Sequence, residues 1–371
     1  MKVFNKEEDV VAEFEKDNQK LYESAWKSQF FSGIMMPVMQ FVGNLGYVMV
    51  ALLGGWFTIK GSIEVGDIQS FFQYIRNFTQ PIQQIAQVTN LLQSSAAASE
   101  RVFEFLDEEE EETTKENAVS IDGLSGNVEF DHVSFAYPEA GENVITDISF
   151  KAEKGETVAI IGSTGSGKST LINLIPRFYD ATEGSVKVDG VDVREMTQKD
   201  VRDRIGYVPQ KGILFSGTID SNIRYGKTEI PEDTVKKAAE VAQATEFIDT
   251  KPERYKTPIA QGGSNVSGGQ KQRLSIARAI AKDPEIFIFD DSFSALDFKT
   301  DSTLRKALKE HTKEATTIIV AQRISTILNA DKILVLDDGH MAGIGSHKEL
   351  MKSCEVYRQI AMSQLSEEEL A

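Results

Sequence analysis

The chain has 371 residues, enough for two domains, and 26% of them are charged, with a formal net charge of −17. This acidic balance excludes a nucleic-acid partner that is held mainly through its phosphates. The only cysteine, Cys354, excludes a disulfide within the chain and favours a reducing compartment.

The N-terminal part of the chain contains a long uncharged segment. Residues 28–59 carry no charged side chain, and Lys27 and Lys60 flank them. A membrane-spanning helix needs about 20 mostly apolar residues, so we predict a span over about 30–59. A second, weaker span over about 67–90 carries Arg76 and many amides, which we expect to face other helices or an aqueous cavity. Two helices cannot enclose a pathway, so we expect further membrane helices from the same or another chain, within membrane lipid.

The helix of this second span is predicted to bend at Pro81 and to continue out of the membrane to Phe105. The acidic run "DEEEEETTKEN" over 107–117 is typical of a solvated spacer. We therefore predict three parts: a partial membrane domain over 1–106, an acidic linker over 107–122 and a second domain over 123–371. From about Asn127 short β-rich runs alternate with helical runs, which predicts an α/β fold for this second domain.

The stretch "ETVAIIGSTGSGKSTLINLI" (156–175) reads as a strand, a glycine loop and a helix. Backbone N–H groups of such a loop surround phosphates, and the helix N-terminus adds its positive end. Lys168 is predicted to neutralise the β- and γ-phosphates, and Ser169 to ligate magnesium. The predicted phosphate-binding residues are Gly162, Ser163, Thr164, Gly165, Ser166, Gly167, Lys168, Ser169 and Thr170.

A second magnesium contact is predicted at Asp290, where the apolar run "IFIF" (286–289) ends in two aspartates. A buried strand that delivers a carboxylate to the metal is typical of enzymes with this loop. These two segments together predict a domain that binds a nucleoside triphosphate with Mg²⁺.

The stretch "NVSGGQKQRLSIARAI" (265–280) narrows this prediction. It resembles the signature segment of ATP-binding cassette (ABC) proteins, with Val266 in place of a leucine. In that family the segment, here Ser267, Gly268, Gly269 and Gln270, contacts the γ-phosphate of ATP held by the opposite subunit. The resemblance therefore implies two cassettes that work as a pair.

Further short matches stand in the family's order. Tyr137 in "VSFAYPE" stands where an aromatic ring stacks on adenine, and Gln210 in "GYVPQKGILFSGTI" where a glutamine reaches Mg²⁺ and the attacking water. "SALD" (294–297) matches the loop that communicates across the pair. The whole chain resembles the C-terminal part of an exporter-type ABC half-transporter: its last two membrane helices, preceded by a coupling segment over 1–27, and its nucleotide-binding domain. The resemblance implies a bacterial plasma membrane, with the cassette in the cytoplasm and the first four helices outside this chain.

Two positions depart from the family pattern, and both belong to the predicted catalytic set Asp291, Gln322 and Gln210. The family's water-orienting glutamate is Asp291 here, which holds its carboxylate up to ~1.5 Å farther back. The family's switch histidine is Gln322, which donates hydrogen bonds but carries no charge. Losing well-placed base catalysis typically costs roughly 10²- to 10⁴-fold in rate.

These departures predict a site that holds ATP and turns it over slowly, as in the degenerate half of a heterodimeric exporter. The transported substrate is not predicted by the sequence. Two alternatives remain open. One is a homodimeric exporter with two working Asp291 sites. The other is a nucleotide-sensing regulatory subunit that transports nothing.

Overall fold

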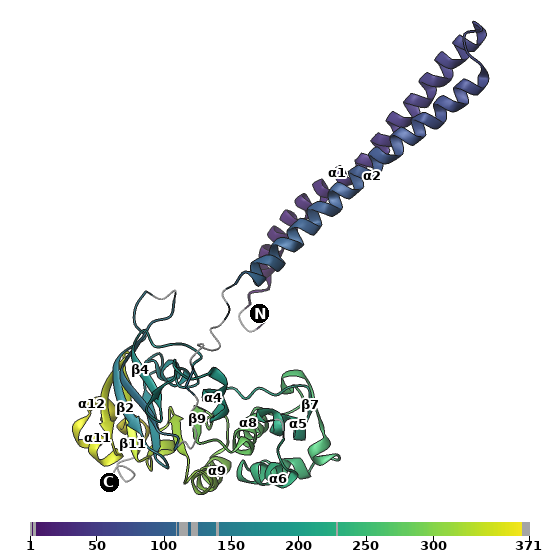
Figure 1. Ribbon diagram of the computed structural model, residues 1–371. Helices are drawn as coiled ribbons and strands as arrows, with labels where there is room; N and C mark the ends of the chain where they lie inside the picture. Colours follow the sequence, from purple (N-terminus) through teal and green to yellow (C-terminus); the bar gives the residue numbers. More distant parts are fainter. Residues whose placement is uncertain are drawn as a thin grey trace. The chain divides into compact units, whose positions relative to one another are not determined.

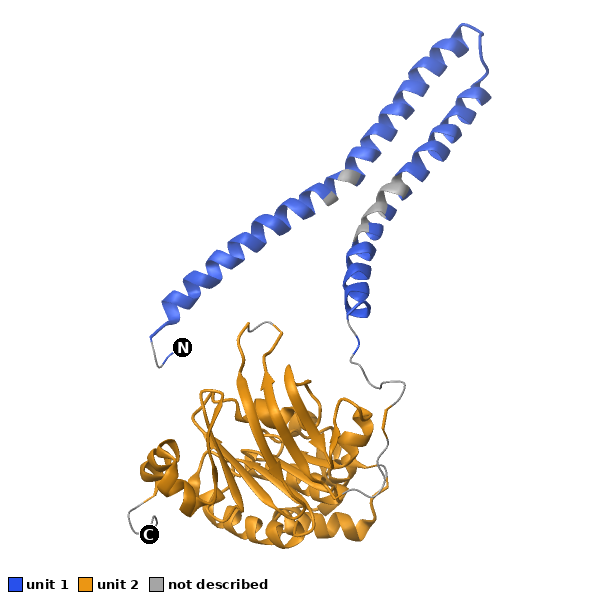
Figure 2. Cartoon of the chain, turned by 60° about the vertical axis from the view of Figure 1, so that its left-hand side comes forward, with its two compact units in different colours: residues 1–110 blue, residues 111–371 orange. Residues whose placement is uncertain are grey.

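A computed structural model describes residues 2, 5–108, 110, 118–119, 125–138, 141–227 and 229–365. The chain divides into two compact units, residues 1–110 and residues 111–371 (Figure 2). Most of the predicted acidic linker over 107–122 lies outside the described residues, as do residues 1, 3 and 4 of the predicted coupling segment.

Unit 1 is a hairpin of two long helices, α1 (Glu7–Ile59) and α2 (Val65–Leu106), joined by a short turn (Figure 2). Within the described residues, α1 is the one helix that is long and apolar enough to cross a membrane. At 1.5 Å per residue its 53 residues extend about 80 Å, against about 30 Å of hydrocarbon. The helix therefore carries the predicted coupling residues from Glu7 onward as a continuous extension of the span. Both helices run unbroken through a proline, Pro37 in α1 and Pro81 in α2.

Small residues on one face of α1 allow α2 to approach closely. A Cβ placed on Gly54 would lie 2.8 Å from Cγ1 of Ile68, and one on Gly46 would lie 3.8 Å from Cγ2 of Ile75. Between these two contacts, the rings of Tyr47 and Phe72 lie 5.3 Å apart. Glycines at an interhelical face are typical of helix pairs that pack without help from the hydrophobic effect.

In its described residues, unit 2 contains three sheets and the remaining helices (Figure 1). Its strands are β1 (Val128–Phe135), β2 (Ile145–Ala152), β3 (Thr157–Gly162), β4 (Glu183–Val188), β5 (Val191–Asp192), β6 (Ile205–Val208), β7 (Gly217–Thr218), β8 (Pro258–Ile259), β9 (Ile286–Asp290), β10 (Thr316–Val320), β11 (Lys332–Asp337) and β12 (His340–Gly345). Its α-helices are α3 (Lys168–Asn173), α4 (Gln198–Asp203), α5 (Ile219–Ile223), α6 (Glu232–Val241), α7 (Thr245–Asp249), α8 (Gly268–Lys282), α9 (Phe298–His311), α10 (Ile324–Ile327), α11 (His347–Ser353) and α12 (Glu355–Gln364).

The central sheet has the strand order β12-β11-β3-β10-β9-β6, and all its strands except β12 run parallel. Its central strands are apolar on both faces, as expected for a parallel sheet that is covered on both sides. In β9, for example, Phe287 and Phe289 belong to one buried cluster, and Ile286 and Ile288 belong to the other.

An antiparallel sheet of order β2-β1-β4-β5 packs through the second cluster, which also contains Leu171 and Ile172 of α3. The helices α5, α6 and α8 pack against one another at one end of unit 2 (Figure 1). The helices α11 and α12 cover the edge near β11 and β12. The loop before α3 therefore lies between the antiparallel sheet and the central sheet, and it opens where the parallel strands of the central sheet end.

Candidate active site

The candidate site forms where four neighbouring parallel strands end. The glycine loop follows β3, Gln322 follows β10, Asp290 ends β9, and Gln210 follows β6. Ligands of open α/β sheets bind outside the carboxyl ends of the strands. A pocket of about 260 Å³ lies there, lined by Val144, Thr164, Gly165, Gly167, Lys168, Ser169, Thr170, Gln210, Asp290, Asp291, Val320 and Gln322.

The glycine loop has a shape that only glycine permits at two positions. Gly167, which precedes the first residue of α3, has φ +91°, and a Cβ there would lie 2.6 Å from Cγ2 of Ile145. A Cβ on Gly162 would lie 2.1 Å from the carbonyl oxygen of Leu336 on the adjacent strand β11. The loop is thus pressed against the sheet, with its open side towards the pocket, which is the arrangement that suits a phosphate group.

Lys168 folds over this loop. Its Nζ donates hydrogen bonds to the carbonyl oxygens of Gly162 (3.0 Å) and Ser163 (2.6 Å) and lies 3.5 Å from Oγ of Ser166. Burial lowers the pKa of Lys168, while the charges of Asp291 and Asp290 oppose that change. An ammonium held by carbonyls at the mouth of the loop is positioned to exchange these contacts for phosphate oxygens.

Ser169 and Asp290 supply oxygen atoms that suit a hard cation. The hydroxyl of Ser169 donates to Oδ1 of Asp290 at 3.0 Å. Burial is the main cause that raises the pKa of Asp290. Within the described ranges no group of three or more His, Cys, Asp or Glu side chains is arranged to hold a metal ion. One hydroxyl and one carboxylate nevertheless fit Mg²⁺, which usually takes one or two carboxylates and completes its shell with water and phosphate.

A hydrogen bond joins Asp291 and Gln322, the two positions at which the sequence departs from the family pattern. Its Oδ2 accepts hydrogen bonds from Nε2 of Gln322 at 2.9 Å and from Nε2 of Gln210 at 3.2 Å. Its backbone has φ +44°, a left-handed conformation that aspartate tolerates better than most residues. Burial raises the pKa of Asp291, and the bond from Gln210 opposes that rise. Three residues from separate segments thus form one hydrogen-bonded group at the wall of the pocket.

The remaining phosphate-loop residues and Tyr137 lie at or near this pocket. Ser163 and Ser166 contact Lys168 rather than line the pocket. Tyr137 is also absent from the lining, but its hydroxyl lies 3.1 Å from Oγ1 of Thr170, on α3. Edge-on contacts with Phe135 and Tyr179 orient its ring. The adenine-stacking role of Tyr137 stays a prediction.

The signature segment lies apart from the pocket of its own chain. Ser267 caps α8 in a reciprocal arrangement with Gln270: its Oγ accepts from the Gln270 N–H at 3.3 Å, and its own N–H donates to Oε1 of Gln270 at 3.1 Å. Ser267 and Gly268 are exposed, Gly269 is half-buried, and none of the four signature residues lines the pocket. The exposed helix N-terminus is therefore available to a ligand outside this chain.

Two pocket residues were missed by the sequence analysis, Val144 and Val320. Val320 ends β10 and Val144 immediately precedes β2, so their place in the site follows from strand ends rather than from chemistry. No motif marks such apolar wall residues; only the register of the sheet could have identified them.

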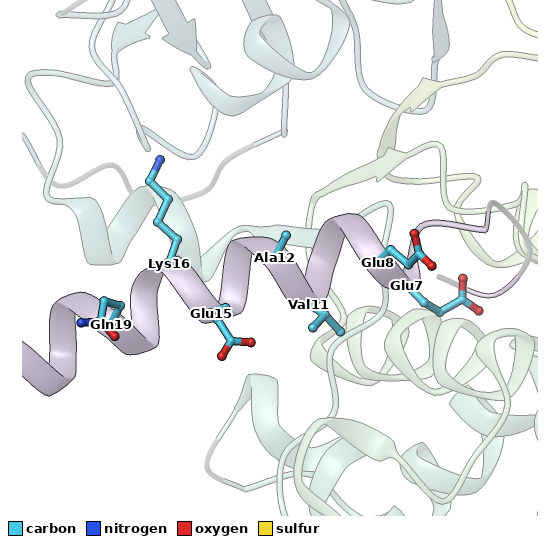
Figure 3. A pocket seen from close by; sticks show the side chains of 7 residues that line it. All are labelled: Glu7, Glu8, Val11, Ala12, Glu15, Lys16 and Gln19. Carbon is cyan, nitrogen blue, oxygen red and sulfur yellow. The ribbon is translucent and has the colours of Figure 1, made fainter.

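A larger hollow of about 710 Å³ lies on unit 1, and Figure 3 shows that all its labelled residues come from the first turns of α1. They are Glu7, Glu8, Val11, Ala12, Glu15, Lys16 and Gln19. These side chains belong to one face of a single exposed helix within the predicted coupling segment. The hollow contains no arrangement of groups suited to catalysis, and the chemistry of the molecule lies in the smaller pocket of unit 2.

Comparisons with known families agree with both units. Residues 1–82 match the family described as ABC transporter transmembrane region, and residues 145–294 match the family described as ABC transporter. The second match contains the glycine loop, Gln210, the signature segment and both aspartates. The two matches follow each other along the chain in the order that the sequence analysis predicted.

Relatives and a solved structure match almost the whole chain. The chain is 42% identical over 360 residues to a Mycobacterium bovis "Fatty acid ABC transporter ATP-binding/permease protein", covering 97% of this chain and 57% of the relative. It is 37% identical to an "ATP-dependent lipid A-core flippase" of Desulfotalea psychrophila, covering 95% and 61%. The solved structure of a bacterial Atm1-family ABC exporter with ATP bound matches with a TM-score of 0.85 and 32% identity, covering 99% of this chain and 64% of that one. The chain therefore spans about three-fifths of the length of the proteins that it matches, and the predicted fold class is confirmed.

Proposed function

Because this chain belongs to the ABC transporter family, we propose that it is the ATP-binding and ATP-hydrolysing subunit of an exporter. It is a multi-pass membrane protein whose nucleotide-binding domain lies in the cytoplasm. ATP binding and hydrolysis in paired cassettes drive the movement of a substrate across the membrane. The membrane helices that complete the pathway come from the same or another chain, and lipid surrounds them.

The phosphate loop and α3 hold the triphosphate of ATP. Backbone N–H groups between Gly162 and Gly167 face it, and Lys168 moves from the loop carbonyls to the phosphate oxygens. Ser169 and Asp290 would hold Mg²⁺ with the help of Gln210. The ion, when bound, would supply positive charge that neutralises part of the charge on the phosphates.

The hydrolytic water is oriented by the group made of Asp291, Gln210 and Gln322. The observation that carries our proposal is that Oδ2 of Asp291 accepts from both amides. This oxygen is already occupied by two neutral donors, and the aspartate side chain is one methylene shorter than glutamate. A water molecule in the pocket therefore meets a carboxylate that is withdrawn by up to ~1.5 Å, and misplacement by about 1 Å can cost 10²-fold in rate.

We infer that this site binds ATP firmly and hydrolyses it slowly, and that the faster hydrolysis takes place at the site of a partner cassette. The partner is a second ABC half-transporter, and a heterodimer is favoured. The exposed signature segment, Ser267 to Gln270, supports this assignment because it serves the site of the opposite subunit. Its capped helix N-terminus is intact although the chain's own catalytic positions are altered.

The test compares ATP turnover of the purified chain in lipid nanodiscs with that of the Asp291→Glu/Gln322→His variant, with ATP binding measured in both. We expect equal binding and a rise in turnover of roughly 10- to 100-fold in the variant. An Asp337→Glu/Gln359→His variant makes the same two changes at exposed positions and should leave both quantities unchanged. A parent chain that hydrolyses ATP as fast as the variant would instead favour a homodimeric exporter with two working Asp291 sites.

A second experiment tests the partner role of the signature segment. The activated variant, mixed with the parent chain, serves as a stand-in for the catalytic partner. A Ser267→Arg change in the parent should reduce turnover of the mixture, because it obstructs the segment that faces the partner's ATP.

For transport, amphiphilic lipids are the first substrates to test in vesicles, since the named relatives carry a fatty acid and a lipid A-core. ATP turnover without ATP-dependent movement of any tested substrate would favour the regulatory subunit.

A further inference from the structure

The loop that carries Gln322 is held from outside the pocket by one side chain of the C-terminal helix α12. Oε1 of Gln364 accepts a hydrogen bond from the backbone N–H of Ile324 at 2.8 Å. Nε2 of the same amide donates to the backbone carbonyl oxygen of Gln322 at 2.9 Å. A single side chain, 40 residues away in sequence, thus binds the loop on both sides of Arg323.

Both backbone groups need a partner for structural reasons. The helix α10 begins at Ile324, and the residue before it, Arg323, makes no side-chain capping bond. The first N–H groups of a helix have no acceptor within the helix. The side chain of Ile324 is completely buried, so its N–H lies at the edge of the core. Gln364 supplies the missing acceptor and uses its remaining amide protons to fix the preceding carbonyl.

The position of Gln364 is determined by the packing of α12. Tyr357 and Ala361 are both fully buried, and Gln364 follows them on the same face of the helix. The hydroxyl of Tyr357 also shares a 2.7 Å hydrogen bond with Nδ1 of His347, which begins α11. The amide of Gln364 is therefore presented to the loop by a helix that is fixed at two points of the core.

The loop passes this constraint to the pocket. The peptide whose carbonyl Gln364 holds belongs to Gln322, and the side chain of Gln322 donates to Oδ2 of Asp291 at 2.9 Å. We propose that Gln364 is a positioning residue for ATP hydrolysis: it orients Gln322 through its backbone carbonyl, and Gln322 in turn orients Asp291. This inference rests on the hydrolytic function proposed above and adds α12 to the parts of the chain that set its rate.

The contacts of Gln364 determine which kinetic constant changes. Gln364 does not line the pocket, and its two hydrogen bonds go to Gln322 and Ile324 rather than to the phosphate loop. Its loss should therefore lower kcat and leave KM for ATP unchanged. A change that merely destabilised the domain would lower the amount of active protein without this separation.

The experiment uses the full chain in lipid nanodiscs, in the parent and in an Asp291→Glu background, so that a slow parent does not conceal the effect. We expect Gln364→Ala to lower kcat about five- to tenfold, the equivalent of one or two lost hydrogen bonds. Gln364→Glu keeps the acceptor for Ile324 but places an oxygen against the Gln322 carbonyl, so it should lose as much as the alanine variant. Gln359→Ala is the matched control, because Gln359 is an exposed residue of the same helix and its side chain donates to Oε1 of Glu355, within that helix.

A double-mutant cycle with Gln322→Ala decides whether Gln364 acts through Gln322. We expect the combined variant to be no slower than Gln322→Ala alone, because a residue that acts through another adds nothing once that residue is gone. Hydrogen exchange of residues 321–328, measured by mass spectrometry, should be faster in Gln364→Ala than in the parent. Additive losses in the cycle, a kcat within twofold of the parent, or a fully active Gln364→Glu variant would each overturn the proposal.

The two proposals fail in different ways. No ATP turnover in any chain, Asp291→Glu included, overturns the hydrolytic function. In that case hydrogen exchange still tests whether Gln364 fixes the loop that carries Gln322. Faster exchange of residues 321–328 in Gln364→Ala supports this role, and unchanged exchange overturns it.

Discussion

Replacing Gly162 by alanine should damage the nucleotide site without changing any group that touches ATP chemically. Gly162 ends β3 and pairs with Leu336 of β11. The added Cβ would lie 2.1 Å from the Leu336 carbonyl oxygen and 2.7 Å from Oγ of Ser166. An ordinary carbon–oxygen contact measures about 3.3 Å, so the strand end must move by about 1 Å. The obstacle is a backbone atom of Leu336, a completely buried residue of β11, and it cannot rotate away as a side chain could.

The size of the effect follows from this crowding. Forced insertion of a methyl group into a packed core costs about 3 kcal/mol at the upper end of its usual range. For a domain of this size, 1 kcal/mol lowers the melting temperature by about 2–4 °C, so Gly162→Ala should lower that of unit 2 by about 6–12 °C. The shifted loop should also bind ATP at least about tenfold more weakly, because 1.4 kcal/mol of lost contact suffices for that.

Two other glycines separate steric crowding from backbone strain. Gly165 has φ +88° but faces open space, so Gly165→Ala meets only the strain of a left-handed residue, about 1 kcal/mol. Its melting temperature should fall by about 2–4 °C. Gly66, in α2, has open space and ordinary backbone, so Gly66→Ala should leave unit 2 unchanged.

Scanning calorimetry and binding of a fluorescent ATP analogue measure these changes. The two tryptophans, Trp26 and Trp56, both lie in α1, so tryptophan fluorescence reports unit 1 and serves as an internal control. That signal should melt at the same temperature in all three variants. Our reasoning is refuted if Gly162→Ala melts within 2 °C of the parent, or if it loses no more stability than Gly165→Ala.

Two more predictions concern the stability of unit 2. Burial lowers the pKa of both His311 and His347. Below about pH 6.5 the unfolded chain therefore binds more protons than the folded chain. The free energy of unfolding of unit 2 then decreases as the pH is lowered. The His311→Gln/His347→Gln variant should show a smaller drop in melting temperature between about pH 7.5 and 5.5, and an equal drop would contradict the assignment. Asp301 is 6% exposed and accepts two bonds from Arg305, at 3.0 and 2.9 Å. Asp301→Ala should cost about 3 kcal/mol in urea unfolding; a loss below about 0.5 kcal/mol would show that solvent satisfies Arg305.

Much of the fold could be predicted because its signals are local. The run "IFIF" before Asp290 and the apolar stretch before Gly162 each indicate a buried strand, and both are strands of the central sheet. The uncharged segment over 28–59 likewise lies within one helix. The separate antiparallel sheet was not predicted, because β1 pairs on one side with its neighbour β2 and on the other with β4, which follows the whole phosphate loop. Such pairing depends on tertiary packing rather than on any short pattern.

The site was predicted as a set of residues but not as a geometry. The motifs indicate the chemical types at Lys168, Asp290 and Gln322, and the structure brings them to one pocket. The hydrogen bonds from Gln210 and Gln322 to the same oxygen of Asp291 could not be predicted, since side-chain orientation follows from where each strand ends. Gln364 gave no signal at all, because a glutamine near the end of an amphipathic helix is ordinary in sequence.

The order of strands in the central sheet has a consequence for biosynthesis. The strand β10 (Thr316–Val320) lies between β3 and β9, both of which are synthesised earlier. A nascent chain that has not yet reached Thr316 therefore lacks the strand that joins its two halves, and β3 and β9 cannot pair with each other in the native register. The phosphate loop and the paired aspartates can therefore face each other only once the ribosome has entered the last third of the cassette and made β10. Because β11 is also made after β10, both edges of β3 and one edge of β9 stay open until then, which is when aggregation and chaperone binding are favoured most.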